Sequence, residues 1–216
     1  MNIQRLKSNK AFVSAALLIV LLVVALLGRQ LLKANSVKLP ICNLNASYSI
    51  NVQDPTVLMG DADFCFIANV DSFVGTNYLH PVDISDAHGT RTVSLPYTQY
   101  KVSVLESIKG QITKDQKINL SKAGGISESQ LEYYLYEKDF LPAVGGTYIF
   151  FAYVQPDGSL LVSGENSTQV LRTANQAAES KAVIGTINQG LTQDQLTAAL
   201  ADQIMTQRQR FNPKFG

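Results

Sequence analysis

The sequence predicts a mainly β protein: a small five-stranded barrel with an apolar helix before it and an amphipathic helix after it. Three observations support this prediction. Short segments in the middle of the chain alternate apolar and polar residues between glycine-rich breaks, which is typical of strands. An uncharged run near the N-terminus has the length of a membrane span. After residue 172, Ala, Gln, Thr and Asp largely replace the aromatic residues and the apolar period becomes about 3.6.

Length and composition set the domain organisation. The chain has 216 residues, enough for one ordinary domain with appendages. Its net charge of +1, without a basic stripe, argues against nucleic-acid binding. We expect a cytoplasmic tail, a transmembrane signal-anchor helix, an extracytoplasmic linker, an OB-like β-barrel domain and a helical C-terminal tail. These parts correspond to residues 1–10, 11–28, 29–56, 57–172 and 173–216.

The N-terminal apolar run, 11–28, is the predicted contact with the membrane. Its uncharged core of 17 residues would reach roughly 26 Å as a helix, close to the thickness of the hydrocarbon layer. Cations precede it, and a short N-terminal tail favours the cytoplasm. We therefore expect a single-pass protein of the cell membrane whose C-terminal domain is extracytoplasmic. Cleavage near the small residues at 34–36, with secretion of the rest, remains the alternative.

The two cysteines, Cys42 and Cys65, have no partner motif for metal or redox chemistry. In an oxidising exterior such a pair favours a disulfide, which would close a loop of about 20 residues and contribute about 3 kcal/mol. The alternative is two unpaired thiols, with Cys65 buried on a strand.

The predicted strands follow in order. Residues 64–70 form the first, and a long polar loop at 75–96 separates it from the second, 97–109. In that second strand Tyr100, Val102 and Val104 should face the core, and Lys109-Gly110 should form a turn. The third strand is 116–122, the fourth, 145–154, is apolar on both faces and therefore central, and the fifth, 159–165, returns as a hairpin after Pro156-Asp157-Gly158.

Besides the membrane span, helical segments are predicted in three places. Ser127 followed by Gln130 has the capping-box spacing, so 127–140 should hold a helical turn or two, and 175–189 a shorter helix. Thr192 and Gln195 repeat that spacing before an apolar stripe at Leu196, Leu200 and Ile204. Arg208 and Arg210 would then lie at the helix C-terminus. This helix could cover the barrel, meet a partner or lie on the membrane.

Five strands with a long first connection and a glycine break after the third are typical of a small OB-like barrel. The segments "DADFCFIANV", "YKVSVLESIKG", "INLSKAGG", "VGGTYIFFAYV" and "DGSLLVSGE" carry a narrower likeness. In this order they resemble bacterial secreted or membrane-anchored proteins, mostly of unknown function, with a netrin/tissue-inhibitor-of-metalloprotease-like OB-fold domain. The resemblance covers 61–170 and implies the fold more than an activity. Inhibitors of that type present an N-terminal cysteine to zinc, whereas Cys42 is internal, so we do not expect inhibition.

One loop carries metal-ligand chemistry. His80, Asp83, Asp86 and His88 lie within nine residues and could wrap a divalent metal, although their spacing matches no helix face or known finger. The sequence contains no nucleophile elbow, phosphate loop or zinc-protease motif. We therefore predict a protein that is not an enzyme and needs no cofactor. A metal-binding protein or metal-dependent hydrolase using this loop is the alternative.

The candidates for a binding surface are Tyr133, Tyr134 and Tyr136, because tyrosine offers a large contact area at little cost in entropy. The predicted function is thus a non-enzymatic, membrane-anchored extracytoplasmic binding module for a protein or a cell-envelope polymer. A second alternative is a structural component of a surface assembly that docks through the C-terminal helix.

Overall fold

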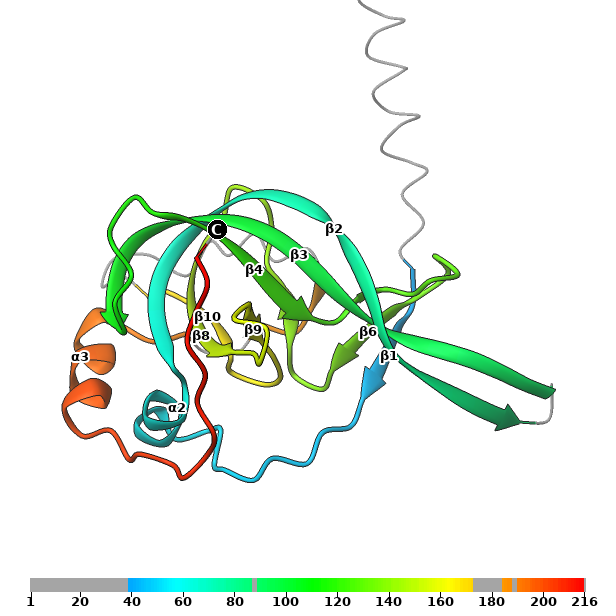
Figure 1. The fold of residues 1–216 in the computed structure, drawn as a ribbon, viewed down its shortest axis with the longest axis horizontal. Coiled ribbons are helices and arrows are strands. Elements are labelled where there is room, and N and C mark those ends of the chain that lie inside the picture. Colours follow the sequence, from blue (N-terminus) through cyan, green and yellow to red (C-terminus); the bar gives the residue numbers. More distant parts are fainter. Residues whose placement is uncertain (1–38, 87–88, 173–183, 188–189, 216) are drawn as a thin grey trace, which may run out of the picture. The chain divides into compact units, whose positions relative to one another are not determined.

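The computed structural model describes residues 39–86, 89–172, 184–187 and 190–215 (Figure 1). The chain divides into two compact units, Met1–Leu39 and Pro40–Gly216, and the description below concerns the second. Within the described ranges no helix is long and apolar enough to cross a membrane. The predicted span at 11–28 lies outside those ranges, as do most residues of the helix predicted at 175–189.

The domain is a closed five-stranded barrel, which confirms the predicted mainly β architecture. Its strands are β2 (Phe64–Asp86), β3 (Gly89–Lys109), β4 (Lys117–Ala123), β8 (Thr147–Val154) and β9 (Leu160–Val162). Neighbours pair in the order β8-β2-β3-β4-β9, and a β8–β9 pairing closes the ring. Every pair is antiparallel except β4 with β9. A short strand, β10 (Thr168–Val170), pairs with β8.

Alternating side chains fill the barrel. Tyr100, Val102 and Val104 of β3 are buried in its interior, as their spacing predicted. The predicted burial of the fourth strand on both faces is also confirmed, because β8 serves two cores. Phe150 points into the barrel, whereas its neighbour Phe151 belongs to a cluster outside it.

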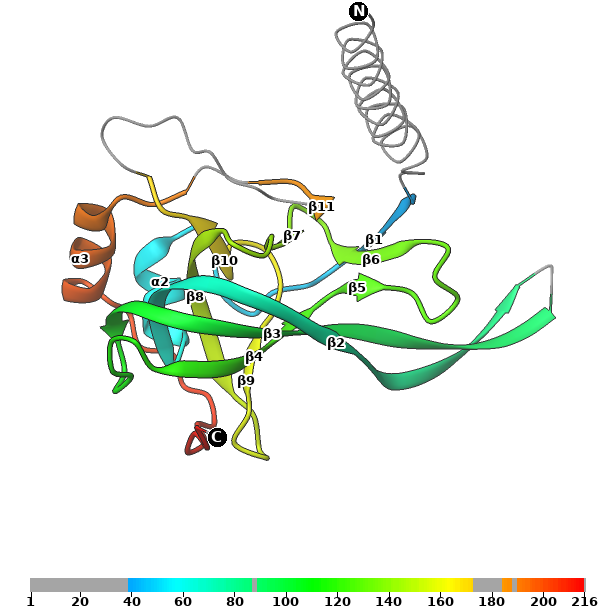
Figure 2. The ribbon, with the colours of Figure 1, turned by 90° about the horizontal axis from the view of Figure 1, so that it is seen from above.

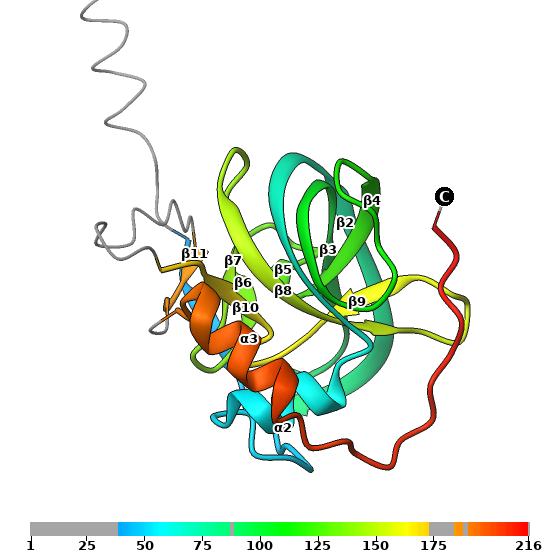
Figure 3. The ribbon, with the colours of Figure 1, turned by 90° about the vertical axis from the view of Figure 1, so that its left-hand side faces the viewer.

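Two short helices form that outer cluster against β2 and β8. They are α2 (Pro55–Asp61) and α3 (Gln193–Ala201), which Figure 3 shows on the same side of the barrel. Asp54 caps α2, and the Thr192–Gln195 capping box predicted for α3 is present. Apolar residues of the helices and strands meet in a cluster formed by Leu58, Met59, Ala62, Cys65, Ile67, Ile149, Phe151, Leu191, Leu196 and Ala199. The C-terminal helix therefore covers the barrel.

The C-terminal helix is shorter than its pattern suggested. It ends at Ala201, and Ile204 lies beyond it with 55% of its surface exposed. The placement of Arg208 and Arg210 at the helix end was wrong, since both bind carboxylates near α2 instead. Charged hydrogen bonds to fixed partners outweigh the weaker attraction of a helix terminus.

The polar segment 75–96 is a hairpin rather than a loop. β2 and β3 stay paired out to Asp86 and Gly89, and Figure 2 shows the far part of the hairpin projecting beyond the barrel. Cross-strand pairs such as Leu79 with Leu95 continue the register, with bulges on the way. The Thr, Val, Ile and Tyr residues in this stretch favour strands in spite of the polar residues between them.

The helical turn predicted at 127–140 was also wrong. This region forms β6 (Tyr133–Tyr136) and β7 (Phe140–Leu141), which pair with β5 (Gly125–Ile126) and β11 (Ile184–Gly185). Instead of capping a helix, Ser127 shares a hydrogen bond with the Ser129 hydroxyl, and its amide donates to Glu132 across a turn. The predicted linker 29–56 also contains a strand, β1 (Ile41–Leu44), which pairs parallel to β6.

The predicted disulfide does not form. Cys42 lies on β1, in register with Tyr134, whereas Cys65 is fully buried in the outer cluster, and both thiols are free. Burial raises the pKa of the Cys65 thiol, so this side chain is a small apolar core residue. The alternative of two unpaired thiols, with Cys65 on a strand, is the one the structure contains.

Candidate binding surfaces

An apolar groove lies where β2 leaves the barrel. It encloses a cavity of ≈ 430 Å³ between β2, β3 and the segment that follows β7. On this edge of β2 the last backbone hydrogen bonds are those of Val70, which donates to the carbonyl of Gly146 and accepts from the amide of Gly145. The residues that line the apolar groove are Phe73, Thr76, Thr98, Tyr100, Ile126, Gln130, Tyr133, Leu141, Pro142, Ala143, Val144 and Ile184.

The groove has exposed apolar rims above a fixed aromatic floor. Phe73 and Val144 are 55% and 51% exposed, whereas Tyr100 is buried. The rings of Phe73 and Tyr100 meet edge to face at 6.4 Å. Burial raises the pKa of Tyr100, so its hydroxyl stays neutral. Such a surface suits a largely apolar ligand, and its lining contains no charged side chain that could pair with a charged one.

The three candidate tyrosines do not form one patch. Tyr133 lines the apolar groove, but alternation along β6 turns Tyr134 and Tyr136 to the other face of the strand. The Tyr134 hydroxyl donates to Glu132 at 2.9 Å. All three side chains are half-buried. Of the three predicted binding residues, only Tyr133 thus lines the groove. The sequence did not indicate its rims, Phe73 and Val144, because they lie far apart in the chain.

The residues of the proposed metal loop lie at the far end of the hairpin. The His80 ring meets the Tyr97 ring at 5.9 Å, and the Asp83 carboxylate accepts a hydrogen bond from Thr92 at 2.7 Å. Asp86 ends β2, and His88 falls outside the described residues. In the part of the chain that the structure describes, no three His, Cys, Asp or Glu side chains are gathered closely enough to hold a metal ion.

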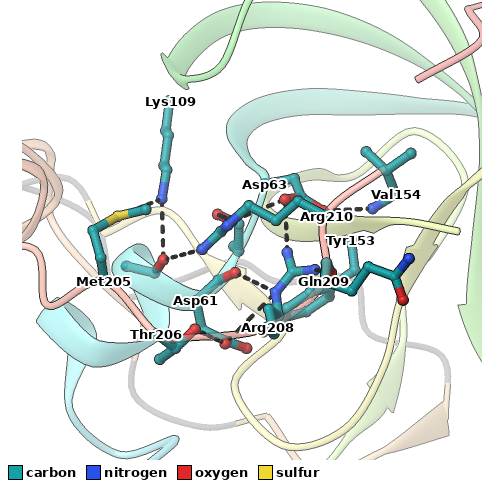
Figure 4. Close-up of polar contacts among 12 residues, drawn as sticks. Asp61, Asp63, Lys109, Tyr153, Val154, Met205, Thr206, Arg208, Gln209 and Arg210 are labelled. Carbon is teal, nitrogen blue, oxygen red and sulfur yellow. Dashed lines mark hydrogen bonds and ion pairs between the residues drawn. The ribbon is translucent and has the colours of Figure 1, made fainter. Parts of the chain in front are cut away.

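A charged cluster joins the C-terminal tail to the end of α2 (Figure 4). Asp63 lies 2.7 Å from the guanidinium of Arg208 and 2.8 Å from that of Arg210. Its other carboxylate oxygen accepts from the amide of Val154 at 2.8 Å. Burial opposes ionisation of Asp63, but the hydrogen bonds from Arg208, Val154 and Arg210 outweigh it and lower its pKa. Arg208 also lies over the Tyr153 ring, 5.0 Å from its centroid.

A second charged pair is buried inside the domain. Lys122 of β4 donates to the carboxylate of Asp139, and the exposed fractions of the two side chains are 0% and 1%. Asp139 also accepts from the amide of Phe140 at 2.8 Å. Burial raises the pKa of Asp139, and Lys122 opposes that shift. No pattern in the sequence indicated this pair, because its members lie 17 residues apart in the chain.

No family model matches the chain, and no curated protein matches its sequence.

Proposed function

We propose that this chain is a membrane-anchored, extracytoplasmic binding module without enzymatic activity, which holds a protein partner through the apolar groove. The observation that carries the proposal is the pair of exposed apolar rims, Phe73 and Val144, above the buried Tyr100. Solvent exposure of grouped apolar side chains is unfavourable for a free domain and is typical of interaction sites. The cavity volume of ≈ 430 Å³ falls in the usual range for bound side chains and small ligands.

A protein fits the groove better than an envelope polymer does. The exposed rims of this groove, Phe73 and Val144, are aromatic and aliphatic, which favours apolar side chains of a protein over a polar polymer. Among the described residues, β2 has no second strand partner beyond Val70, so its backbone edge borders the groove. An extended segment of a partner could add to this edge and place alternate apolar side chains in the cavity.

The barrel itself is proposed to be of the OB type. Numbered along the chain, its strands pair in the order first, second, third, fifth, fourth, and the parallel pair joins third and fifth. This arrangement supports a five-stranded Greek-key barrel. We further propose that the barrel is related to the netrin/tissue-inhibitor-like bacterial domains that residues 61–170 resemble.

The membrane anchor and the extracytoplasmic location rest on the apolar run at 11–28 and its flanking charges. They can be tested on the intact chain. We expect it to stay with membranes after alkaline extraction and the domain to be digested by protease added outside the cytoplasm. Release by alkaline extraction without cleavage of the chain would contradict the anchor.

Photocrosslinking tests the groove directly. A photoreactive phenylalanine analogue at Phe73 should capture a protein in intact cells, and the same analogue at Leu105 should not. Leu105 is a matched control because it is an exposed apolar residue (41%) of β3 outside the groove. Val144→Ser should reduce capture from position 73. Equal capture at both positions, or products that contain only glycan or lipid, would refute the proposal.

A further inference from the structure

The C-terminal strap, residues 203–215, is an extended segment that packs along the surface of the domain. It follows α3, runs beside α2 and then crosses the barrel to the C-terminus (Figures 1 and 3). It contains no strand or helix, and none of its residues is buried. Among the described residues, few backbone hydrogen bonds join the strap to the domain: the amide of Ile204 donates to the carbonyl of Thr56, and that of Lys214 donates to the carbonyl of Gly158. Side chains therefore hold the strap in place.

The receiving surface is an acidic notch formed by Gly60, Asp61, Ala62 and Asp63. Beyond the ion pairs with Asp63, the notch offers backbone carbonyls to the same two arginines. Arg210 donates to the Gly60 carbonyl at 2.8 Å, and Arg208 donates to the Asp61 carbonyl at 2.8 Å. The carboxylates of Asp61 and Asp63 are only 13% and 9% exposed. Partly buried acceptors of this kind bind guanidinium groups strongly.

The shape of the notch also matches the strap. A Cβ atom at Gly60 would lie 1.8 Å from the carbonyl oxygen of Ile204, so the strap backbone rests directly on this glycine. Past the arginines, Phe215 meets Phe64 edge to face at 5.6 Å, and Phe211 packs on the barrel core. The match between strap and domain thus extends from residue 204 to residue 215.

We propose that the acidic notch is a recognition site for an extended Arg-x-Arg segment and that it also takes the strap of a second copy of this chain. The charges are complementary, with Asp61 and Asp63 on the domain and Arg208 and Arg210 on the strap. Each copy carries both halves, so exchange of straps forms the same contacts between chains that now form within one. The strap is joined to α3 directly, so its high effective concentration favours the closed single chain until copies are concentrated.

Two complementary variants of the full-length chain, purified in mild detergent, test this. Arg208→Ala with Arg210→Ala keeps the notch but disables the strap. Gly60→Ala keeps the strap but blocks the notch, and alanine is otherwise compatible with helix α2. Light scattering should show single chains for each variant alone and a heterodimer for the mixture. A strap peptide, residues 203–216, should compete for the notch and dissociate the heterodimer. A peptide lacking both arginines should bind the notch at least about tenfold more weakly.

A matched control uses the strap residues that face solvent. Gln207→Ala with Gln209→Ala changes exposed neighbours of the two arginines, so this variant should remain closed and should not pair with Gly60→Ala. A mixture that stays monomeric at about 100 μM, with thermal melting showing both variants folded, would overturn the proposal. If a variant does not fold, the proposal is tested on the wild-type chain instead. Its dimer fraction must rise with concentration and fall when the strap peptide is added, and a constant monomer overturns the proposal.

Discussion

Lys122→Met should be among the most damaging single changes in the barrel. Lys122 and Asp139 are both buried, and Ser167 lies 3.5 Å from the ammonium group. Removal of the lysine leaves a carboxylate without its counter-charge, which costs about 3–5 kcal/mol in the free energy of unfolding. With a urea slope of about 2 kcal/mol per molar, the midpoint should fall by roughly 1.5–2.5 M. We expect this loss in the unit Pro40–Gly216, which has its own cores.

The double variant separates the pair from its surroundings. Lys122→Met with Asp139→Asn removes both charges, so its free energy of unfolding should lie within about 1 kcal/mol of wild type. The pH adds a second check, because the pKa of Asp139 is raised above its ordinary 3.8 in the folded state. A raised acid pKa means that stability falls as pH rises from 3.8 through the folded-state value, and the lysine-free variant should show this more steeply. A single-variant loss below about 1 kcal/mol, or strictly additive losses, would refute the reasoning.

Three further outcomes are expected. The pKa of Asp63 is lowered below 3.8, so its contribution is complete above that pH and is lost as pH falls through the folded value. Hydrogen exchange should then show the amides of Ile204 and Lys214, which donate to the domain, losing protection in acid, and protection retained at pH 2 would contradict this. Gly110→Ala should destabilise the domain by about 1–3 kcal/mol in thermal melts, since Gly110 has φ +87° and its Cβ would lie 2.2 Å from Phe64. Gly75→Ala, with open space around it, is the control and should change little. The full chain should not take up stoichiometric zinc, because among the described residues no three possible metal ligands lie close together; uptake that His80→Ala abolishes would restore the metal hypothesis.

Local patterns predicted the parts of the fold that local physics determines. Alternation in β3 identified Tyr100, Val102 and Val104 as core residues, and the Thr192–Gln195 box placed the start of α3. The end of α3 was not predictable in this way. Its apolar stripe continues to Ile204, but the arginines farther along find fixed carboxylates only in the folded domain. The same limit applies to Ser127. Its spacing to Gln130 predicted a helix cap, but Ser127 instead lies in a turn between β5 and β6.

The candidate surfaces depended even more on distant contacts. Of the residues that line the groove, only Tyr133 was predicted to bind a partner, because Phe73 and Val144 are ordinary apolar residues until β2 and the segment after β7 meet. One signal for the strap was present in the sequence: Asp61 and Asp63 are two residues apart, as are Arg208 and Arg210. Equal spacing of opposite charges is too common to specify a contact by itself. The equal spacing becomes informative only together with Gly60, whose missing side chain lets the strap backbone lie directly on α2.

The two proposed surfaces can act independently because they lie at opposite ends of one stretch of β2. Asp63 precedes this strand at the notch, and Phe73 lies on the same strand at the groove. Along an extended chain these two residues are up to about 33 Å apart. The barrel core between them, including Phe66 and Val70, is fully buried and therefore leaves little room for one site to distort the other. Loss of Arg208 and Arg210 should therefore leave crosslinking from position 73 unchanged, whereas Val144→Ser should leave strap exchange unchanged. Loss of both activities in one variant would mean that the strap or the groove supports the barrel itself.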